Sequence, residues 1–390
     1  MKKILYLTFY FEPDLCAGSF RNTPLAKKLA ELAGKDLQVH VVTTQPNRYS
    51  TFKVKADAHQ ETGNLVIDRI QLPAHKSGFK DQTRSFKTFY DGALQITKSK
   101  NYDLVFASSS RMFTAYLGKK IAAKKKLPLY LDIRDIFVDT MADVLKNPVL
   151  NKSVLLTVKN FVERPTFRYA NHINLISEGF KSYFKQYPQA NYSYFPNGID
   201  VEFNGLKQKE GLDNSVYVIT YAGNIGEGQG LHKIVPEAAR MLGEKYRFNI
   251  IGDGGTRRLL EEELQRAGVN NVVLLNPMNR KQIIEEYRRS HFLFLHLNDY
   301  EAFKKVLPSK VFEYGATNIP MIAGVGGFAA EFIKKHVPNA LVFSPCNAGE
   351  MVSMVKEYQY RLKERREFQE QFSRDAVNEK MAASILSYLK

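Results

Sequence analysis

Short apolar runs alternate with amphipathic stretches along the first half of the chain. Residues 4–10 form a continuous apolar run, and leucines recur at helical spacing over residues 22–32. The same alternation continues, with strands expected at 37–43, 65–70, 102–107, 129–133 and 171–176 and a helix over 114–125. Strands separated by helices of this length are typical of a parallel, doubly wound sheet.

A second alternation of the same kind begins after a polar stretch over residues 204–214. Its expected strands are 216–221, 246–251, 272–275, 292–297, 321–323 and 340–343, and its expected helices include 231–242, 256–267, 281–290 and one that starts near residue 309. The pattern predicts an α/β protein with two Rossmann-like, doubly wound domains, residues 1–200 and 215–372. In the remaining segment, 373–390, apolar residues recur at helical spacing, which predicts a helix that packs back on the N-terminal domain.

Glycine-rich turns directly follow two expected strands of the second domain. One is residues 221–230 (YAGNIGEGQG), which includes Gly223, and the other is residues 250–255 (IIGDGG), which includes Gly252. Such turns let a backbone approach phosphates at a helix N-terminus. A purely structural turn is the alternative, and neither segment is a P-loop or a dinucleotide fingerprint. Ligands of such sheets bind outside the carboxyl ends of the strands, so two facing sheets are expected to define one cleft between the domains.

The composition fits a folded protein of more than one domain. The 390 residues are 44% hydrophobic and 25% charged, which excludes a disordered chain. The two cysteines, Cys16 and Cys346, cannot form a disulfide framework, and a reduced, cytoplasmic setting is the simpler interpretation. Because Glu12 and Pro13 end the first apolar run early, we interpret it as a buried strand rather than a signal peptide. An uncharged apolar stretch of about 18 residues is absent, so no membrane span is predicted.

The formal net charge of +16 is unevenly placed. Residues 76–126 hold twelve Lys or Arg against three Asp, with aromatic residues between them. Such a segment suits an anionic partner, which is nucleic acid, an anionic bilayer surface or a phosphate-bearing substrate. For any single lysine, a solvated helix face is the alternative. The lysines that we assign to a membrane or acceptor patch are Lys119, Lys120, Lys124, Lys125 and Lys126.

One segment of the second domain, residues 307–316 (LPSKVFEYGA), combines features of a phosphate site and a ribose site. Pro308 suits an early helix position because it has no N–H group to lose. Ser309 and Lys310 then lie in the first turn, where N–H groups and the helix dipole favour a phosphate. Glu313, one turn later, is placed to accept two hydrogen bonds from a ribose diol. A bare helix cap with a solvated glutamate is the alternative.

In this order, the segments resemble the family-4 retaining glycosyltransferases of GT-B fold, particularly bacterial enzymes that build O-antigen or capsule, such as N-acetyl-L-fucosamine transferases. The resemblance covers nearly the whole chain, and the ordered set is more specific than any single motif. The motifs that carry it are Glu12-Pro13, Gly18…Arg21, Asp132-Ile133-Arg134-Asp135, Pro196-Asn197-Gly198-Ile199-Asp200, Gly252-Asp253-Gly254 and Pro308-Ser309-Lys310…Glu313-Tyr314.

The resemblance implies roles for matching positions. Glu313 would hold the nucleotide ribose, and Ser309 and Lys310 would address the diphosphate. The loop at Met278 would meet the base through its backbone. The implied donor-binding residues are Gly18, Arg21, Gly223, Asn224, Gln229, Gly252, Arg257, Met278, Gln282, Leu307, Pro308, Ser309, Lys310 and Glu313. The residues that we assign to catalysis are Lys310, Glu313, Lys305 and Asp135, and for Asp135 a cap on the following turn is the alternative.

The chain departs from the family pattern at three positions. Lys305 stands eight residues before Glu313, where the family carries a glutamate that contacts the donor sugar. Asn224 and Gln229 stand where many members carry the Arg and Lys that neutralise the diphosphate. The neutralising charge is therefore expected from other cations, for which the candidates are Lys310, Lys305, Arg257 and Arg21.

Neither a divalent metal nor a cofactor other than the sugar donor is predicted. Asp132 and Asp135 have DxxD rather than DxD spacing, and Arg134 between them would compete for their charge. Without a metal, helix N-termini and lysines must stabilise the departing nucleoside diphosphate. His172 lies in an expected buried strand and is interpreted as a core histidine with its hydrogen bonds satisfied.

The resemblance thus implies a metal-independent, retaining glycosyltransferase of O-antigen or capsule biosynthesis. It would move an N-acetylated hexosamine or deoxyhexosamine from a UDP-sugar to a polyprenyl-diphosphate-linked saccharide. The enzyme would be peripheral on the anionic inner face of the cytoplasmic membrane. The alternatives are a UDP-N-acetylglucosamine 2-epimerase, which needs no acceptor, and a non-enzymatic basic nucleic-acid-binding protein, which the ordered motifs disfavour, so no nucleic-acid partner is expected. A dehydrogenase is least favoured, because its glycine fingerprint is missing.

Overall fold

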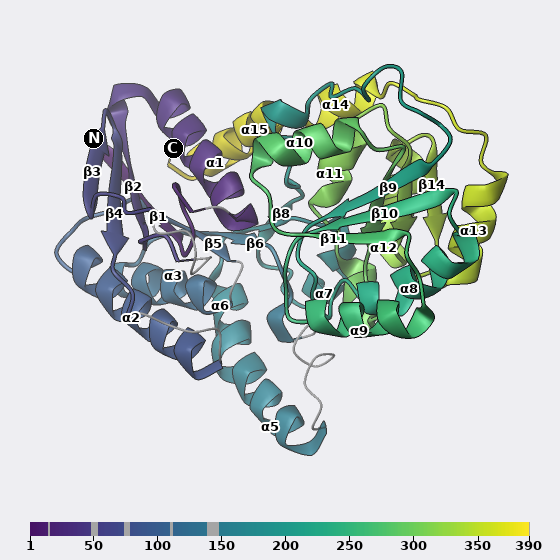
Figure 1. Cartoon of the computed structure of the whole chain (residues 1–390). Coiled ribbons are helices and arrows are strands. Elements are labelled where there is room, and N and C mark those ends of the chain that lie inside the picture. Colours follow the sequence, from purple (N-terminus) through teal and green to yellow (C-terminus); the bar gives the residue numbers. More distant parts are fainter. Residues whose placement is uncertain (15, 48–53, 74–78, 110–111, 139–147, 390) are drawn as a thin grey trace. The chain divides into compact units, whose positions relative to one another are not determined.

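The computed structural model of the chain describes residues 1–390 apart from 15, 48–53, 74–78, 110–111, 139–147 and 390 (Figure 1). It divides into two compact units, of which unit 1 comprises Met1–Asn197 and Asp375–Lys390 and unit 2 comprises Gly198–Arg374. The polar stretch 204–214, which we expected between two domains, belongs to unit 2. There the side-chain amide of Gln208 donates to the Ser290 carbonyl at 2.6 Å.

Unit 1 contains an eight-stranded sheet in which neighbouring strands are parallel, except that β3 is antiparallel to β4. In sheet order the strands are β3 (His59–Thr62), β4 (Leu65–Ile70), β2 (Leu37–Thr44), β1 (Lys2–Thr8), β5 (Leu104–Ser109), β6 (Leu129–Ile133), β7 (His172–Leu175) and β8 (Asn191–Ser193). Without the two edge strands, this is the strand order of a Rossmann fold. The order reverses between β1 and β5, which is the topological switch point of this sheet.

The helices of unit 1 include the C-terminal one. They are α1 (Ala17–Ala33), α2 (Phe79–Thr97), α3 (Met112–Lys125), α5 (Pro148–Val158), α6 (Arg164–Tyr169), α7 (Lys181–Phe184) and α15 (Arg374–Leu386), with a π-helical turn η2 (Lys159–Glu163) between α5 and α6. Met381, Ala382 and Ile385 of α15 lie in one hydrophobic cluster with Ile4 and Leu25. The apolar face of the C-terminal helix is therefore buried in the core of unit 1.

Unit 2 contains a six-stranded parallel sheet with the same order. Its strands, in sheet order, are β11 (Val272–Leu275), β10 (Tyr246–Ile251), β9 (Tyr217–Ala222), β12 (Phe292–His296), β13 (Met321–Gly324) and β14 (Ala340–Phe343). Its helices are α8 (Leu231–Leu242), α9 (Arg257–Ala267), α10 (Arg280–Arg288), α11 (Lys310–Gly315), α12 (Gly327–His336), α13 (Ala348–Glu357) and α14 (Arg366–Phe372), with a 3-10 turn η5 (Glu301–Lys305) before α11. The switch point lies between β9 and β12.

The predicted α/β class with two parallel, doubly wound sheets is confirmed. The expected strands 4–10 and 37–43 correspond to β1 and β2, within about two residues at each end. The edge strand β3 has no counterpart among the expected strands. Its sequence, HQET, is polar and mostly exposed, so it lacks the apolar run that marks a buried strand.

Candidate active site

The two glycine-rich turns of unit 2 pack on each other beside the switch point. The Gly223 amide donates to the Ile251 carbonyl and the Ile225 amide to the Asp253 carbonyl, both at 2.9 Å. Gly252 has a φ of +143°, and a Cβ atom there would lie 1.8 Å from the Gly223 carbonyl oxygen. Glycine is thus required at position 252 by the contact between the two backbones.

Asn224 and Gln229, two of the predicted donor-binding residues, contact each other. The Asn224 side-chain amide donates to the Gln229 side-chain oxygen at 2.9 Å. Helix α8 begins after Gly230, and its first turn carries no acidic side chain. Its N-terminal N–H groups therefore remain favourable for an anion, as expected for a twelve-residue helix.

Lys310 and Glu313 form an ion pair on the first turn of α11. The Lys310 Nζ lies 2.7 Å from Glu313 Oε2 and 3.2 Å from the Tyr287 hydroxyl oxygen. The side chains are 24% and 21% exposed, so both reach solvent from a largely buried position. Burial disfavours the ammonium, but the Glu313 carboxylate and the neighbouring phenols together outweigh burial and raise the pKa of Lys310 above its ordinary value.

Three buried tyrosines surround this ion pair. The Lys310 Nζ lies 5.9 Å from the ring centroids of both Tyr287 and Tyr314. Burial raises the pKa of both phenols well above the ordinary value, so they are neutral at physiological pH. The Tyr221 hydroxyl donates to the Asn224 carbonyl at 2.6 Å. Burial raises the pKa of this phenol, and the charge of Lys310 opposes that shift. Through its hydroxyl, Tyr221 ties strand β9 to the first glycine turn. None of these tyrosines was predicted to belong to the site, because in sequence a buried tyrosine of a strand or helix cannot be told from any other core aromatic residue.

Leu307, Pro308 and Ser309 lead into α11, which begins one residue after the predicted start. Leu307 is buried, whereas Pro308 and Ser309 are partly exposed. The carbonyls of Pro308 and Ser309 each accept an amide of the first turn at 3.1 Å. Because α11 has only six residues, its dipole is small. We expected the N-terminus of this helix to bind the phosphate. Because its dipole is small, the main positive charge of the segment is the Lys310 ammonium.

Arg257 and Lys305 are two further candidates for neutralising the diphosphate. The Arg257 Nη1 donates to the carbonyls of Gly252 at 2.5 Å and Leu275 at 3.2 Å, and Nε donates to Glu261 at 3.2 Å. This guanidinium therefore holds the second glycine turn in place. Lys305 is partly exposed at the end of η5, five residues before Lys310.

Met278 and Gln282 lie at the start of α10. Asn279 caps this helix, and its side chain accepts the Gln282 amide at 3.0 Å. In return the Gln282 side chain accepts the Asn279 amide at 3.1 Å, which completes a capping box. Met278 packs against the hydrophobic core of unit 2. The Gln282 side-chain oxygen therefore already accepts a hydrogen bond at the N-terminus of its own helix.

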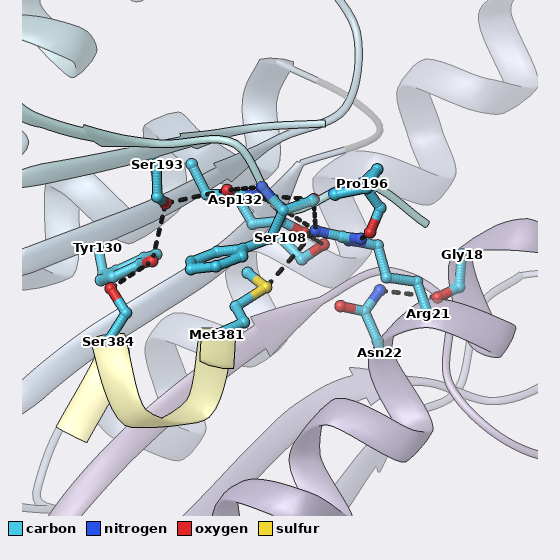
Figure 2. Close-up of polar contacts among 12 residues, drawn as sticks. Gly18, Arg21, Asn22, Ser108, Tyr130, Asp132, Ser193, Pro196, Met381 and Ser384 are labelled. Atoms are coloured by element: carbon cyan, nitrogen blue, oxygen red, sulfur yellow. Dashed lines mark hydrogen bonds and ion pairs between the residues drawn. The ribbon is translucent and has the colours of Figure 1, made fainter. Parts of the chain in front are cut away.

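Arg21, one of the predicted diphosphate ligands, is buried in the core of unit 1. It is 2% exposed, and its Nε and Nη2 donate to the two Asp132 oxygens at 2.9 and 2.8 Å (Figure 2). Its Nη1 donates to the Pro196 carbonyl at 2.7 Å and its Nη2 also to the Phe195 carbonyl at 2.9 Å. A buried carboxylate and two carbonyls thus already satisfy the guanidinium in this structure, and the assignment of Arg21 to the diphosphate stays a prediction.

Asp132 is the centre of a buried polar network in unit 1. It accepts hydrogen bonds from Ser108 and Asn174, each at 2.8 Å, in addition to those from Arg21. Burial disfavours the carboxylate, but the charge of Arg21 and the hydrogen bonds from Arg21 and Asn174, together with the charge of Arg134, outweigh burial and lower the pKa of Asp132. Figure 2 shows Met381 of α15 beside Arg21, at 3.5 Å between sulfur and nitrogen.

Gly18 and Asp135 lie at the ends of elements in unit 1. A Cβ atom on Gly18, in the first turn of α1, would lie 3.1 Å from the Tyr10 Cβ and 3.3 Å from Arg134 Nη1. Close packing therefore favours glycine there whether or not a donor approaches. Asp135 is exposed just after β6.

The five lysines of the predicted patch lie on α3 and directly after it. Lys120, Lys124 and Lys126 are exposed, and Lys119 is partly exposed. The Lys125 amine donates to the carbonyl oxygens of Lys100 at 2.7 Å and Lys98 at 3.4 Å. The exposed members are the ones placed to meet an anionic surface.

The described part of the chain shows neither a metal-binding cluster nor a membrane-spanning helix. No group of three or more His, Cys, Asp or Glu side chains among these residues is placed to hold a metal ion. Within the same residues, no helix is long and apolar enough to span a bilayer.

Two histidines are held neutral by their burial. The His296 Nδ1 donates to the Gln229 carbonyl at 2.6 Å, and its Nε2 accepts the Cys346 amide at 2.9 Å, which defines the tautomer. Burial lowers the pKa of His296 to about 4. In unit 1, His172 contacts the hydroxyls of Ser193 and Tyr388, and burial lowers its pKa to about 4. His172 is thus the satisfied core histidine that we predicted.

The free energy of unfolding is expected to fall as the pH drops from about 6.5 to about 4. In the unfolded chain both histidines bind protons near pH 6.5, whereas in the native protein they bind protons only near pH 4. Inside this window each histidine lowers the free energy of unfolding by at most about 1.4 kcal/mol per pH unit. Below the window it causes no further loss. Urea unfolding at pH 7.5, 5.5 and 4.5 measures the slope, and His296→Gln should reduce it. Equal slopes for both proteins would contradict the prediction.

Residues 202–376 match the family described as Glycosyl transferases group 1. Over 356 residues the chain is 24% identical to WcaI of Escherichia coli (strain K12), named as a colanic acid biosynthesis glycosyl transferase. That match covers 84% of this chain and 83% of the relative. The sequence resemblance to glycosyltransferases is thus confirmed.

Solved structures share this fold. Sucrose-phosphate synthase of Thermosynechococcus elongatus has a TM-score of 0.78 at 13% identity, over 100% of this chain and 99% of the other. HepE of Anabaena, solved in complex with UDP and glucose, has a TM-score of 0.68 at 15% identity, over 99% of this chain and 100% of the other. At these identities the likeness concerns the fold, which is the predicted GT-B fold.

Proposed function

From the premise that the chain carries a glycosyl transferases group 1 domain, we propose that it is a retaining enzyme that takes its sugar from a UDP-sugar. The acceptor in this proposal is a polyprenyl-diphosphate-linked saccharide. The pair Lys310–Glu313 is the observation that carries the proposal, because it places a cation and a carboxylate, both partly exposed, on the first turn of α11, the helix that follows the switch-point strand β12. HepE, a neighbour in fold, was solved with UDP and glucose, which supports UDP as the nucleotide.

In this proposal the two members of the ion pair separate when the donor binds. Glu313 accepts hydrogen bonds from the two ribose hydroxyls, and the Lys310 ammonium turns to the diphosphate. As the bond from the anomeric carbon to the phosphate oxygen breaks, negative charge builds on the leaving UDP. The ammonium and the N–H groups at the start of α8 stabilise that charge without a metal.

Retention follows from attack on the face that UDP leaves. The departing phosphate oxygen takes the proton of the acceptor hydroxyl while the hydroxyl oxygen bonds to the anomeric carbon. The transferred sugar in this proposal is an N-acetylated hexosamine or deoxyhexosamine. Lys305 stands close to Lys310 in sequence and is the proposed contact to the donor sugar, whereas Asp135 of unit 1 is the proposed contact to the acceptor.

The biological setting in this proposal is surface polysaccharide synthesis at the inner face of the cytoplasmic membrane. WcaI, the relative in Escherichia coli, is named for colanic acid, a role of this kind. The exposed lysines of α3, Lys120 and Lys124, would meet anionic headgroups or the acceptor diphosphate.

A thermal-shift panel of UDP-, GDP-, ADP- and dTDP-sugars tests the donor assignment. We expect a UDP-sugar at about one hundred times its Kd to stabilise the protein by about 2.7 kcal/mol. The other three nucleotides should give little shift at the same concentration. A shift confined to a nucleotide other than UDP would contradict the choice of base. Conversion of the UDP-sugar to its epimer without an acceptor would favour the 2-epimerase instead.

A further inference from the structure

The helical arm formed by α5 and η2 exposes large apolar side chains. Val154 is 55% exposed, Leu156 is 50% exposed and Phe161 is 73% exposed. Figure 1 shows α5 leading away from the strands of unit 1. Val154 and Leu156 are two positions apart, which is about 200° around a helix, so the arm is apolar on opposite sides. A surface helix of a soluble domain normally keeps its large apolar side chains on the stripe that faces its own core, whereas these three side chains are exposed to solvent.

Positive charge surrounds these apolar side chains. Arg164 and Arg168 are exposed on α6, and Lys159 is partly exposed on η2. Glu163, the acidic residue of residues 153–169, is fully buried. Helix α3, which packs against η2 and α6, adds the exposed Lys120 and Lys124. The described surface around the arm therefore combines exposed apolar groups with cations.

We propose that this arm is the element by which the protein enters an anionic bilayer. Val154, Leu156 and Phe161 would lie at the boundary between headgroups and acyl chains, and the neighbouring Lys and Arg side chains would pair with lipid phosphates. A second copy of the chain is a poorer occupant, because two such arms would bring the same positive charges together. This inference rests on the proposed function, in which the acceptor is lipid-linked.

The chain contains no tryptophan, so a single introduced tryptophan reports on its own surroundings. We expect the emission of Phe161→Trp to move to shorter wavelength with vesicles of phosphatidylglycerol and phosphatidylethanolamine, and to be quenched by brominated acyl chains. Leu362→Trp, at a 43% exposed apolar position of unit 2, is the matched control and should not respond. An unchanged Phe161→Trp spectrum would overturn the proposal. A shift without vesicles that grows with protein concentration would also overturn it, in favour of self-association.

A second variant measures how much the apolar side chains contribute. The triple substitution Val154→Ser, Leu156→Ser and Phe161→Ser should lower partitioning onto the same vesicles at least tenfold. Its thermal unfolding and its donor-induced thermal shift should stay as in the unmodified protein, because the three side chains are exposed. Unchanged partitioning would contradict the inference. If instead no UDP-sugar stabilises either protein while the vesicle results hold, the donor assignment fails and the bilayer inference stands.

Discussion

Replacing Glu313 by alanine is expected to abolish the thermal shift that the best nucleotide sugar produces and to lower kcat/KM by more than about 100-fold. Two hydrogen bonds from ribose hydroxyls to a carboxylate contribute about 1.5–3 kcal/mol each, and both are lost. The substitution also removes the partner of the Lys310 ammonium, 2.7 Å away. Thermal-shift titration and steady-state kinetics with the same donor measure the two effects.

Two control variants separate binding from folding. Glu313→Gln keeps the shape of the side chain and removes its charge, so it should fold like the unmodified protein and bind the donor more weakly. Glu237→Ala removes an exposed carboxylate from α8 and should leave both the thermal shift and kcat/KM unchanged. A full donor shift in Glu313→Ala would remove this residue from the site.

Replacing Asp132 by alanine is expected to lower the free energy of unfolding by about 3–5 kcal/mol. The substitution leaves the Arg21 guanidinium 2% exposed with no carboxylate beside it. For a unit of this size, that loss corresponds to a Tm lower by roughly 10 °C. Urea unfolding and differential scanning calorimetry measure it.

An exposed ion pair provides the matched control. Lys87 and Asp91 on α2 are 76% and 56% exposed, so Asp91→Ala should change the unfolding free energy by less than about 1 kcal/mol. The double substitution Arg21→Met and Asp132→Leu removes both buried charges and should recover most of the loss. If Asp132→Ala lowers the free energy of unfolding by less than 1 kcal/mol, the prediction is contradicted, and the buried Arg21 guanidinium does not depend on the Asp132 carboxylate.

The alternation of apolar runs was sufficient to predict the two parallel sheets. A strand covered on both faces must be apolar at nearly every position, and β1, with five consecutive fully buried residues, is such a strand. The start of α11 was predicted to within one residue, because the signals for a helix start are local. Polar edge strands such as β3 lack this signal and were missed.

The candidate site was predicted only where its residues are neighbours in sequence. Lys310 and Glu313 are three positions apart on one helix, and the segment itself indicated them. Tyr287, whose hydroxyl lies 3.2 Å from the Lys310 amine, comes from a different helix and was not predicted. Gln282 was assigned to the donor, but its capping box with Asn279 became visible only in the helix itself.

By itself, the sequence determined the fold class, the glycine turns and the segment that carries Lys310 and Glu313. Each of these follows from side-chain period, local backbone freedom or spacing within one helical turn. Only the tertiary structure decided that Arg21 pairs with Asp132, 111 residues away. It also decided that α15 completes the core of unit 1. A buried charge takes whichever opposite charge the folded chain brings within hydrogen-bonding distance, and no local pattern encodes that distance.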